Sequence, residues 1–334
     1  MEDFDALNLV GNSPALLHVL ELTKRFAGCD ATVLLQGETG TGKELVARAI
    51  HYLGARRDFP FIPVNCGALP DSLVERELFG HARGAFTDAR DAKPGLIAEA
   101  QAGTLFLDEI EVLTPKAQVA LLRFLQDLEY RPLGGAVVRD CNVRIIAASN
   151  ANLGQLATGG HFRRDLLFRL DVLSIDIPPL RERRHDVVIL AEKFLMRFGR
   201  QYRRPKTLHP DAVARLLGHD WPGNVRELEN LILREFLMTD GPTIHLQCLA
   251  PRDPGREENR DAGSSRLTAS RFQEAKGCAI ANFERAYIVE LLSRTRGNIS
   301  QAARIAGKER SRLGKLVKKY GLGRVAFARD AEAT

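Results

Sequence analysis

The sequence has no hydrophobic run that approaches the roughly 20 apolar residues needed to span a bilayer. Its amino terminus, MEDFDALNLV, is acidic and lacks the basic start and the apolar stretch of a secretory signal peptide. Cysteine is scarce, and the five present are far apart and without metal-ligand spacing: Cys29, Cys66, Cys141, Cys248 and Cys278. These absences argue against a membrane span, a disulfide framework and a cysteine metal site, and they predict a soluble, cytoplasmic protein.

Positive charge is concentrated at the carboxyl end. The net charge of the 334 residues is +6, yet residues 279–334 alone hold twelve Lys or Arg and five Asp or Glu. The rest of the chain is therefore close to neutral. A neutral body with a basic end is typical of a globular protein that binds nucleic acid there, although a solvated basic helix without a partner would have the same charge.

Short apolar runs alternate with helical patterns over residues 1–177. The runs are TVLLQG (32–37), FIPVN (61–65), TLFLDE (104–109), VRIIAASN (143–150) and VLSIDI (172–177). Strands that alternate with helices of this length predict an α/β domain, with a parallel sheet covered on both faces.

Four further segments follow the α/β part. Residues 178–249 have helical spacing and no strand-like run, which predicts a small helical lid. Residues 250–278 are rich in charge, glycine and serine and are expected to form a flexible linker. Helical periodicity returns in residues 279–322, which predicts an all-α domain, and residues 323–334 are expected to be a frayed tail.

A glycine-rich turn, GETGTGKE, follows the first apolar run and opens a helical pattern. In this context glycines let backbone N–H groups surround phosphates, the helix N-terminus adds partial positive charge, and Lys43 reaches the outer phosphates. The predicted nucleotide-binding residues are Gly37, Glu38, Thr39, Gly40, Thr41, Gly42, Lys43 and Glu44. Glu44 stands where the usual pattern has Ser or Thr to ligate Mg²⁺. A strand–helix turn that binds no nucleotide is the alternative.

Polar side chains end two of the later apolar runs. After GTLFL, Asp108 is expected to hold Mg²⁺ through water, and Glu109 to polarise the attacking water. A buried strand ending in Asp-Glu would be unremarkable alone, but together with a phosphate loop it indicates hydrolysis. Asn150 ends VRIIAASN and is a candidate to contact the γ-phosphate.

Arginines suited to phosphoryl transfer occur at two further places. The stretch HFRRDLLFRL supplies Arg163, Arg164 and Arg169. Arginine stabilises the charge of phosphoryl transfer and is often supplied across an interface, although surface arginines in salt bridges would give the same pattern. In WPGNVRELENLI, Asn224 and Glu227 resemble a capping box. Arg226 then lies in the first helical turn, where a cation is unfavourable unless an anion such as a phosphate compensates it.

Seven blocks in this order make the sequence similar to a known family. GETGTGKELVARAIH, FIPVNCGAL, ELFGHARGAFTDA, GTLFLDEI, FRRDLLFRL, PPLRER and WPGNVRELEN resemble those of bacterial enhancer-binding proteins, the AAA+ activators of sigma-54 RNA polymerase in the NtrC family. The similarity runs from Val10 to Leu246 and implies an AAA+ P-loop NTPase that uses ATP and Mg²⁺. Glu after the loop lysine is characteristic of the family. Arg164 departs from it, since an acid is common there, and this change can alter the subunit interface.

The resemblance also implies roles for single residues. It implies a ring, usually a hexamer assembled from dimers, with ATP between the subunits. Arg163 and Arg169 would be fingers that reach a neighbour's nucleotide, and Arg226 would sense the nucleotide from the lid. Asn65, at the end of FIPVN, would be a switch that holds the catalytic Glu109 out of action.

One block corresponds to the family's sigma-54-contacting loop, which normally has the sequence GAFTGA. Its residues here are Gly84, Ala85, Phe86, Thr87, Asp88 and Ala89. Phe86 and Thr87 would make the contact, which accounts for an apolar side chain on an exposed loop. Asp88 replaces the usual glycine. Asp tolerates left-handed backbone, so the turn can persist, but it adds a negative charge to the contact surface.

The carboxyl end, RGNISQAARIAGKERSRLGKLVKKYGL, has the pattern of a helix, a turn at Gly307 and a second helix, and it resembles the helix-turn-helix of the Fis nucleoid protein. The residues expected to pack the first helix are Ile299, Ala302, Ala303 and Ile305. The predicted DNA-binding residues on the second helix are Arg310, Ser311, Arg312, Lys315, Lys318 and Lys319. Arg310 and Arg312 are candidates for base contacts, and the later lysines for phosphate contacts. A helical dimerisation module with a basic face is the alternative.

The sequence thus predicts an ATPase that binds enhancer-like double-stranded DNA, forms a ring, and remodels sigma-54 RNA polymerase from closed to open complex. Because the chain starts almost directly at the ATPase, without a receiver domain, control is expected from a regulatory protein acting in trans, from expression level, or from nucleotide and DNA. Two alternatives stay open. One is a DNA-binding regulator that does not act through sigma-54, which Asp88 favours, and the other is an AAA+ motor that acts on another macromolecule.

Overall fold

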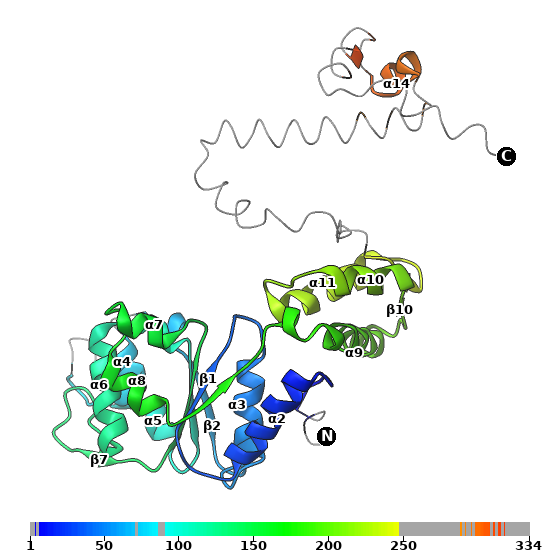
Figure 1. Ribbon diagram of the computed structural model, residues 1–334. Coiled ribbons are helices and arrows are strands. Elements are labelled where there is room, and N and C mark those ends of the chain that lie inside the picture. Colours follow the sequence, from blue (N-terminus) through cyan, green and yellow to red (C-terminus); the bar gives the residue numbers. More distant parts are fainter. Residues whose placement is uncertain are drawn as a thin grey trace. The chain divides into compact units, whose positions relative to one another are not determined.

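The computed structural model describes residues 4, 7–70, 73–85 and 91–246, and towards the carboxyl end residues 288, 291, 295, 298–307, 310, 313–314 and 317. The chain divides into two compact units, Met1–Arg252 and Asp253–Thr334. The first unit holds an α/β part followed by a helical lid (Figure 1). Every helix within the described residues is too short or too polar to cross a membrane.

A five-stranded sheet forms the centre of the α/β part. Its strands are β1 (Val33–Gln36), β2 (Phe61–Asn65), β5 (Thr104–Asp108), β8 (Arg144–Ser149) and β9 (Leu173–Asp176). They pair in parallel in the order β2-β5-β8-β1-β9. The central strands β5 and β8 are buried along nearly their whole length, as expected of strands covered on both faces. The predicted parallel α/β sheet is confirmed.

Helices cover the two faces of this sheet (Figure 1). On one face lie α2 (Pro14–Ala27) and α3 (Lys43–Tyr52), and on the other α4 (Val74–Phe79), α5 (Leu96–Glu99), α6 (Pro115–Asp127), α7 (Leu153–Thr158) and α8 (Arg164–Leu170). Two of these helices begin with proline after a capping hydroxyl: Ser13 caps α2 and Thr114 caps α6. Proline fits the first helical position because its missing N–H would have no partner there.

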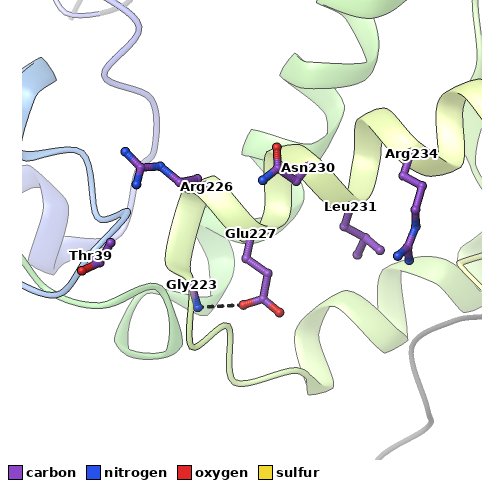
Figure 2. Close-up of a pocket in the computed structure, with 7 residues that line it drawn as sticks. All are labelled: Thr39, Gly223, Arg226, Glu227, Asn230, Leu231 and Arg234. Atoms are coloured by element: carbon purple, nitrogen blue, oxygen red, sulfur yellow. Dashed lines mark hydrogen bonds between the residues drawn. The ribbon is translucent and has the colours of Figure 1, made fainter. Parts of the chain in front are cut away.

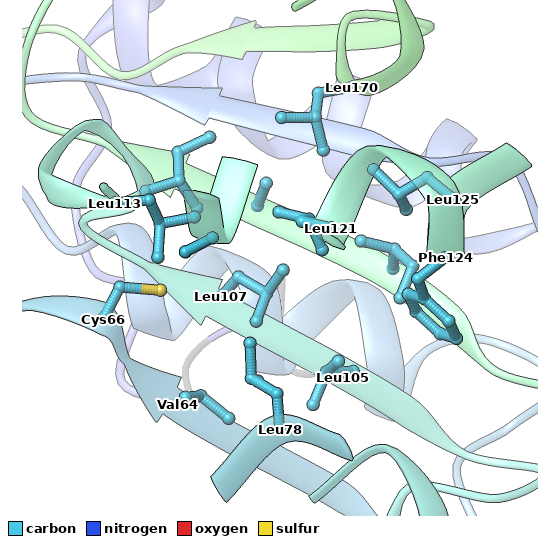
Figure 3. Close-up of a cluster of buried hydrophobic side chains, with 14 of the residues drawn as sticks. Val64, Cys66, Leu78, Leu105, Leu107, Leu113, Leu121, Phe124, Leu125 and Leu170 are labelled. Atoms are coloured by element: carbon cyan, nitrogen blue, oxygen red, sulfur yellow. The ribbon is translucent and has the colours of Figure 1, made fainter. Parts of the chain in front are cut away.

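Alternation along the strands divides the core into two layers. Leu105 and Leu107 of β5 pack among the side chains of α4 and α6, whereas Phe106 between them packs with those of α2 and α3. Figure 3 shows the first layer, in which Leu107 lies between Leu78 of α4 and Leu121 of α6. The sheet is therefore held rigidly from both sides, which fixes the loops at the carboxyl ends of its strands.

Two short antiparallel pairs project from the α/β part. Strands β3 (Gly80–His81) and β4 (Lys93–Pro94) pair on either side of residues 82–92, and β6 (Glu129–Tyr130) pairs with β7 (Arg139–Asp140). Leu133, between β6 and β7, joins the two pairs: its N–H donates to Gly80 (2.9 Å) and its carbonyl accepts from Ala82 (2.9 Å). The base of the predicted sigma-54 loop is thus bonded to the β6–β7 connection.

The lid consists of a short turn of 3₁₀ helix, η3 (Leu180–Glu182), and three helices, α9 (Arg184–Tyr202), α10 (Pro210–Gly218) and α11 (Asn224–Met238). They pack around the buried Trp221, whose indole N–H donates to the Leu216 carbonyl. The prediction that residues 178–249 contain no strand was wrong. β10 (Thr207–Leu208) and β11 (Thr243–Ile244) form a parallel pair, and strands of two residues are too short to give an alternating pattern.

A buried carboxylate ties the start of the chain to the lid. Asp186, in the first turn of α9 and 0% exposed, accepts hydrogen bonds from Asn12 N (2.8 Å), Ser13 N (2.9 Å) and Ser13 Oγ (2.5 Å). The adjoining Gly11 has a φ of 152°, and a Cβ there would collide with the Asp186 carboxylate. Residues 11–13 and α9 are therefore fitted closely to each other.

The second unit contains α14 (Ile299–Ile305), capped by Asn298, whose side chain accepts from Ser300 N and Gln301 N. Ala302 and Ala303 pack with Leu291 and Leu313, and Ile299 lies partly buried beside them. The expectation that Ile305 packs with them was wrong, because 57% of Ile305 is exposed. Residues 299, 302, 303 and 306 form one helical stripe, and position 305 falls outside it.

Candidate nucleotide-binding site

The phosphate loop joins β1 to α3. Gly40 and Gly42 have positive φ angles, 79° and 105°, which favour glycine. Lys43 begins α3 and is only 6% exposed. Its ammonium group donates to the carbonyls of Gly37 (2.7 Å) and Glu38 (3.0 Å) and to the side-chain oxygen of Asn150. The loop thus holds one buried cation at the amino end of a helix, the arrangement that suits a phosphate.

Acids at the carboxyl end of β5 face this lysine. Burial lowers the pKa of Lys43, and Asp108, Glu111 and Glu109 act in the opposite direction. Burial also raises the pKa of Asp108, against the effect of Lys43. Both shifts indicate a poorly solvated site, where charge–charge interactions are stronger than in water.

Asn150, which follows β8, connects the lysine with the acids. Besides accepting from Lys43, its amide nitrogen donates to Glu109 Oε1 (3.4 Å), and its backbone N–H donates to Glu111 Oε1 (3.0 Å). One residue therefore contacts both the phosphate-loop cation and the acid that was predicted to polarise water. Adjacent parallel strands explain this, because β5 and β8 pair directly and end at the same edge of the sheet.

Glu111 is a third carboxylate that the sequence analysis did not identify. It lies in the 3₁₀ turn η2 (Ile110–Val112), and its Oε2 is buried without a hydrogen-bond partner. The sequence does show an acid two residues after Glu109, and this spacing is the signal that could have identified Glu111. A buried carboxylate beside Lys43 adds negative charge to the site and holds the backbone of Asn150.

Asn65, the predicted switch, lies at the end of β2 beside Asp108 in the register of the sheet. Its side-chain oxygen accepts from Ala68 N (3.0 Å) and caps the turn η1 (Cys66–Ala68). A Cβ on Gly67 would contact both Glu109 Oε2 and this Asn65 oxygen, so the two groups flank the same glycine. The described hydrogen bonds join Glu109 to Asn150 rather than to Asn65.

Cys66, which follows Asn65, has a buried thiol. Burial, reinforced by the charges of Asp108, Glu111 and Glu109, raises the pKa of its thiol to about 12. A thiolate is the nucleophilic form of cysteine. The Cys66 side chain packs in the core, as Figure 3 shows, and its thiol is in the un-ionised form at neutral pH.

The lid contacts the phosphate loop through the first turn of α11. Val225 N donates to the Gly40 carbonyl (3.0 Å), and Asn224 Nδ2 donates to the Thr39 carbonyl (3.1 Å). Asn224 was expected to cap α11 in a capping box, which was wrong. Gly223 is the cap, and its N–H donates to Glu227 (2.8 Å), while the fully buried Asn224 side chain binds the phosphate loop and the N–H of Leu180.

Arg226 lies where the sequence predicted, in the first turn of α11. Its side chain leaves the helix on the side of the loop that carries Thr39 (Figure 2), and its charge contributes to lowering the pKa of Lys43. A cavity of about 530 Å³ lies beside it, lined by Thr39, Gly223, Arg226, Glu227, Asn230, Leu231 and Arg234. An anion bound in this cavity would lie beside the positive charge of Arg226, which belongs to the lid.

Two arginines of the PPLRER segment, at the start of the lid, donate hydrogen bonds to the phosphate loop. Arg181 donates two hydrogen bonds to the carboxylate of Glu38 (2.8 and 2.6 Å), and Asn224 donates a third (3.1 Å). The bond from Arg181 is the main reason why the pKa of Glu38 is lowered. The buried Arg183 donates to the Thr41 carbonyl (3.0 Å). Glu38 was predicted to bind nucleotide, but its carboxylate is engaged with the lid.

A larger cavity, of about 790 Å³ and with both apolar and charged lining residues, adjoins the start of α3. It is lined by residues of the amino-terminal segment, α3, α9 and α11, including Val10, Leu45, Leu190, Phe194 and Val225. Leu45 is two residues beyond the phosphate-loop lysine. A planar apolar group linked to phosphates would therefore reach this cavity while its phosphates lie at the loop.

The structure does not bring the predicted finger arginines to the same subunit's phosphate loop. Arg163 is exposed and pairs with Asp165 (3.0 and 2.6 Å). Arg169 donates to the carbonyls of Leu125 (2.9 Å) and Gln126 (3.0 Å) at the end of α6. Arg164 is exposed at the start of α8. Within the described contacts, all three are engaged elsewhere or face solvent.

The remaining predicted residues are only partly described. Glu44 is half-exposed and forms an ion pair with Arg48 (2.7 Å). Gly84, with a φ of 78°, and Ala85 are described, whereas Phe86, Thr87, Asp88 and Ala89 lie outside the described residues. Arg310 is in helical conformation and is exposed. The other predicted DNA-binding residues, Ser311, Arg312, Lys315, Lys318 and Lys319, lie outside the described residues.

Fold and site together define a P-loop nucleotide-binding protein with a helical lid. Three family models match successive parts of the chain: the sigma-54 interaction domain matches residues 9–176, the AAA+ ATPase lid domain residues 181–265, and the Fis family of bacterial regulatory proteins residues 279–320. The chain therefore belongs to the sigma-54 interaction domain family. The predicted class, an AAA+ P-loop fold followed by a Fis-type helix-turn-helix, is confirmed.

Two known relatives are longer than this chain. The phenol regulator MopR of Acinetobacter guillouiae is 41% identical over 96% of this chain and 58% of its own, and the nitrogen fixation protein AnfA of Azotobacter vinelandii is 40% identical over 99% and 60%. The chain thus spans about three-fifths of the length of these two. The solved structure of NtrX from Brucella abortus in complex with ATP is 33% identical, with a TM-score of 0.68 over 94% of this chain and 69% of that one.

Proposed function

We propose that the chain is an ATP-hydrolysing transcription activator that forms a ring, binds enhancer-like DNA, and remodels sigma-54 RNA polymerase from closed to open complex. One observation carries the hydrolysis. Asn150 contacts Lys43 with its amide oxygen and Glu109 with its amide nitrogen. A phosphate held by Lys43 would therefore lie beside a carboxylate able to act on water. A site that only bound nucleotide would not need that carboxylate.

ATP is proposed to bind with its phosphates at the loop, from Gly37 to Glu44, and its adenine in the larger cavity beside Leu45. Arg226 would contact the phosphates from the lid. The NtrX neighbour, whose solved structure is a complex with ATP, supports ATP as the nucleotide. Val225 and Asn224 of the lid are hydrogen-bonded directly to the loop. Binding of phosphates at the loop would therefore act on the lid through these two bonds.

The residues present fit Mg²⁺. Asp108 ends β5 next to Lys43, and within the described residues no group of three or more His, Cys, Asp or Glu forms a metal cage. Mg²⁺ is usually bound by one or two carboxylates together with water and substrate phosphates, which is the donor set that Asp108 and a nucleotide provide. The ion would neutralise phosphate charge, and Asp108 would hold it through water.

Glu109 is proposed to orient the attacking water and to accept its proton. Its backbone φ of 56° directs the chain away from β5 into η2. Asn65 is proposed to act as the switch, because its side chain and the Glu109 carboxylate flank Gly67. A contact between these two groups would replace the bond from Asn150 and would take Glu109 away from the phosphate.

Arg163 and Arg169 are proposed to serve the nucleotide of a neighbouring subunit. Their own contacts support this, since neither contributes to the phosphate site of its own subunit within the described residues. An arginine supplied in trans stabilises the charge of the transition state. Hydrolysis would then require a ring or at least a dimer, and it would depend on protein concentration.

Lys43→Ala will weaken ATP binding by about 100-fold or more, the equivalent of about 3 kcal/mol, because a desolvated charge partner of the phosphates is lost. Titration with a fluorescent ATP analogue measures the affinity. Lys24→Ala, on the exposed face of α2, removes the same charge outside the site and should bind as the wild type does. Equal affinity in both variants would contradict the phosphate-loop assignment.

The loop from Gly84 to Ala89 is proposed to contact sigma-54 through Phe86 and Thr87, and the carboxyl-terminal helix-turn-helix to bind DNA with Arg310, Ser311, Arg312, Lys315, Lys318 and Lys319. The family matches at 9–176 and 279–320 support both. A second candidate function follows from Asp88, whose charge lies within the contact loop. It is a DNA-binding regulator that keeps the ring but does not act through sigma-54.

Thr87→Ala will keep ATPase activity but lose open-complex formation, because Thr87 is not among the proposed nucleotide-binding or catalytic residues and its loop is proposed to act only on the polymerase. The assay uses a sigma-54 promoter, purified polymerase and ATP, with hydrolysis measured in parallel. Asp88→Gly is the informative companion. If the wild type opens the promoter, the activator assignment stands, whereas opening by Asp88→Gly alone would favour the second candidate.

A further inference from the structure

Gln118, on the buried face of α6, has a side chain that is fully hydrogen-bonded to three backbone groups. It is 1% exposed. Its amide nitrogen donates to the carbonyls of Leu113 (2.9 Å) and His161 (3.3 Å), and its amide oxygen accepts from the N–H of Arg163 (2.9 Å). Arg163 is the cap residue of α8 and makes no side-chain capping bond of its own, and Asp165 Oδ1 accepts from Leu166 N (2.8 Å) within the first turn. Gln118 is the side chain that binds the N–H of Arg163 itself. Gln118 therefore fixes the point at which the finger segment enters its helix.

The same side chain reaches the segment that leaves the catalytic acid. Leu113 is four residues after Glu109, and the turn between them is closed by bonds from Val112 N to Glu109 O (3.2 Å) and from Leu113 N to Ile110 O (3.3 Å). Gln118 thus contacts the end of a short, closed turn that begins at Glu109. It also accepts from the N–H of Arg163, a residue 45 positions further along the chain.

Only a carboxamide satisfies these three partners. Two carbonyls need donors and one N–H needs an acceptor, and a glutamine side chain offers both on one planar group. A glutamate would place a second acceptor against two carbonyls, and a methionine would leave all three backbone groups without partners. The residue type at 118 is therefore dictated by these contacts and not by packing volume.

We propose that Gln118 is a positioning residue that holds the backbone of Arg163 where its guanidinium can reach the neighbouring subunit's nucleotide. This rests on the proposed function, in which Arg163 acts in trans. Gln118 does not touch the nucleotide or the reacting atoms. It joins the segment after the subunit's own Glu109 to the finger that serves the next subunit, so it contributes to hydrolysis at a site other than its own.

The test is complementation between subunits. Gln118→Glu should lower kcat of the assembled protein by about 100-fold, as expected for a misplaced catalytic group, with nucleotide affinity unchanged. Three mixtures are then compared. Arg163→Ala with Glu109→Gln should regain hydrolysis, since each supplies what its neighbour lacks. Gln118→Glu with Glu109→Gln should regain it likewise, and Gln118→Glu with Arg163→Ala should stay inactive, since both lack a working finger.

The outcomes separate the two proposals. If Arg163→Ala and Glu109→Gln do not complement, the finger in trans fails and the inference on Gln118 fails with it. If they complement but Gln118→Glu is rescued by Arg163→Ala instead, Gln118 serves its own site and the inference alone is overturned. Gln118→Met, close in length and volume, is tested in parallel. Loss of nucleotide binding by both variants would also overturn the inference. Gln155→Glu, exposed on α7, is the matched control.

Discussion

Replacing Arg163 with alanine will lower the ATP turnover number by about 1,000-fold or more, the loss expected when an arginine finger is removed. Nucleotide affinity should stay as in the wild type, because Arg163 is bonded to Asp165 and not to its own subunit's phosphate loop. Steady-state hydrolysis measured at a protein concentration that supports assembly gives the turnover number. Titration with a fluorescent ATP analogue gives the affinity.

Arg164→Ala is the matched control for this variant. It removes the same charge from the next position of the chain, which is exposed at the start of α8 and is not one of the two proposed fingers, and the protein concentration is set so that both variants are assembled. Equal losses in the two variants would show that a basic surface matters and that no single arginine acts as a finger. Unchanged turnover in Arg163→Ala would remove it from the catalytic site altogether.

Asp186→Ala will lower the free energy of unfolding of the first unit by about 3–5 kcal/mol. The carboxylate is completely buried and accepts from three donors of residues 12 and 13, and each of these donors would lose its partner. The buried Arg183, whose pKa the charge of Asp186 helps to raise against the effect of burial, would also lose a neighbouring anion. Urea unfolding followed by the fluorescence of the single Trp221 measures the change.

Asp211→Ala provides the comparison, because Asp211 lies in the first turn of α10 as Asp186 does in α9 but is exposed. Its loss should cost less than about 1 kcal/mol, the range of a surface charge near a helix end. A small effect at both positions would mean that residues 11–13 are not held by Asp186. A selective effect at Asp186 would show that the amino-terminal segment is part of the lid's fold.

Local pattern was enough to predict the centre of this protein. The glycines and lysine of the phosphate loop, the acids after β5 and Asn150 after β8 are each recognisable within a few residues, because apolar runs, glycine turns and strand-terminal acids are short-range signals. Parallel pairing of β5 and β8 then places Asp108, Glu109 and Asn150 at one edge of the sheet without further information.

The contacts that hold the site in place were not predictable in this way. Arg181 meets Glu38 across 143 residues, and Asn224 meets it across 186. Neither side chain differs, in the sequence, from an ordinary surface arginine or a helix-capping asparagine. The capping box was consistent with local chemistry, yet tertiary contacts to the phosphate loop decided the role of Asn224. Gln118 was missed for the same reason, since its three partners are backbone groups that a sequence does not distinguish.

The junction between Gly40 and the lid leaves no room for independent movement. A Cβ on Gly40 would overlap the Gly223 carbonyl, and Val225 N is bonded to Gly40 O. Helix α11 extends from this junction over 15 residues, a length of about 22 Å. A rotation of about 10° at its first turn would displace Met238 by about 4 Å. If a change at the phosphate loop rotated this first turn, the far end of α11 would therefore move by about the length of a side chain.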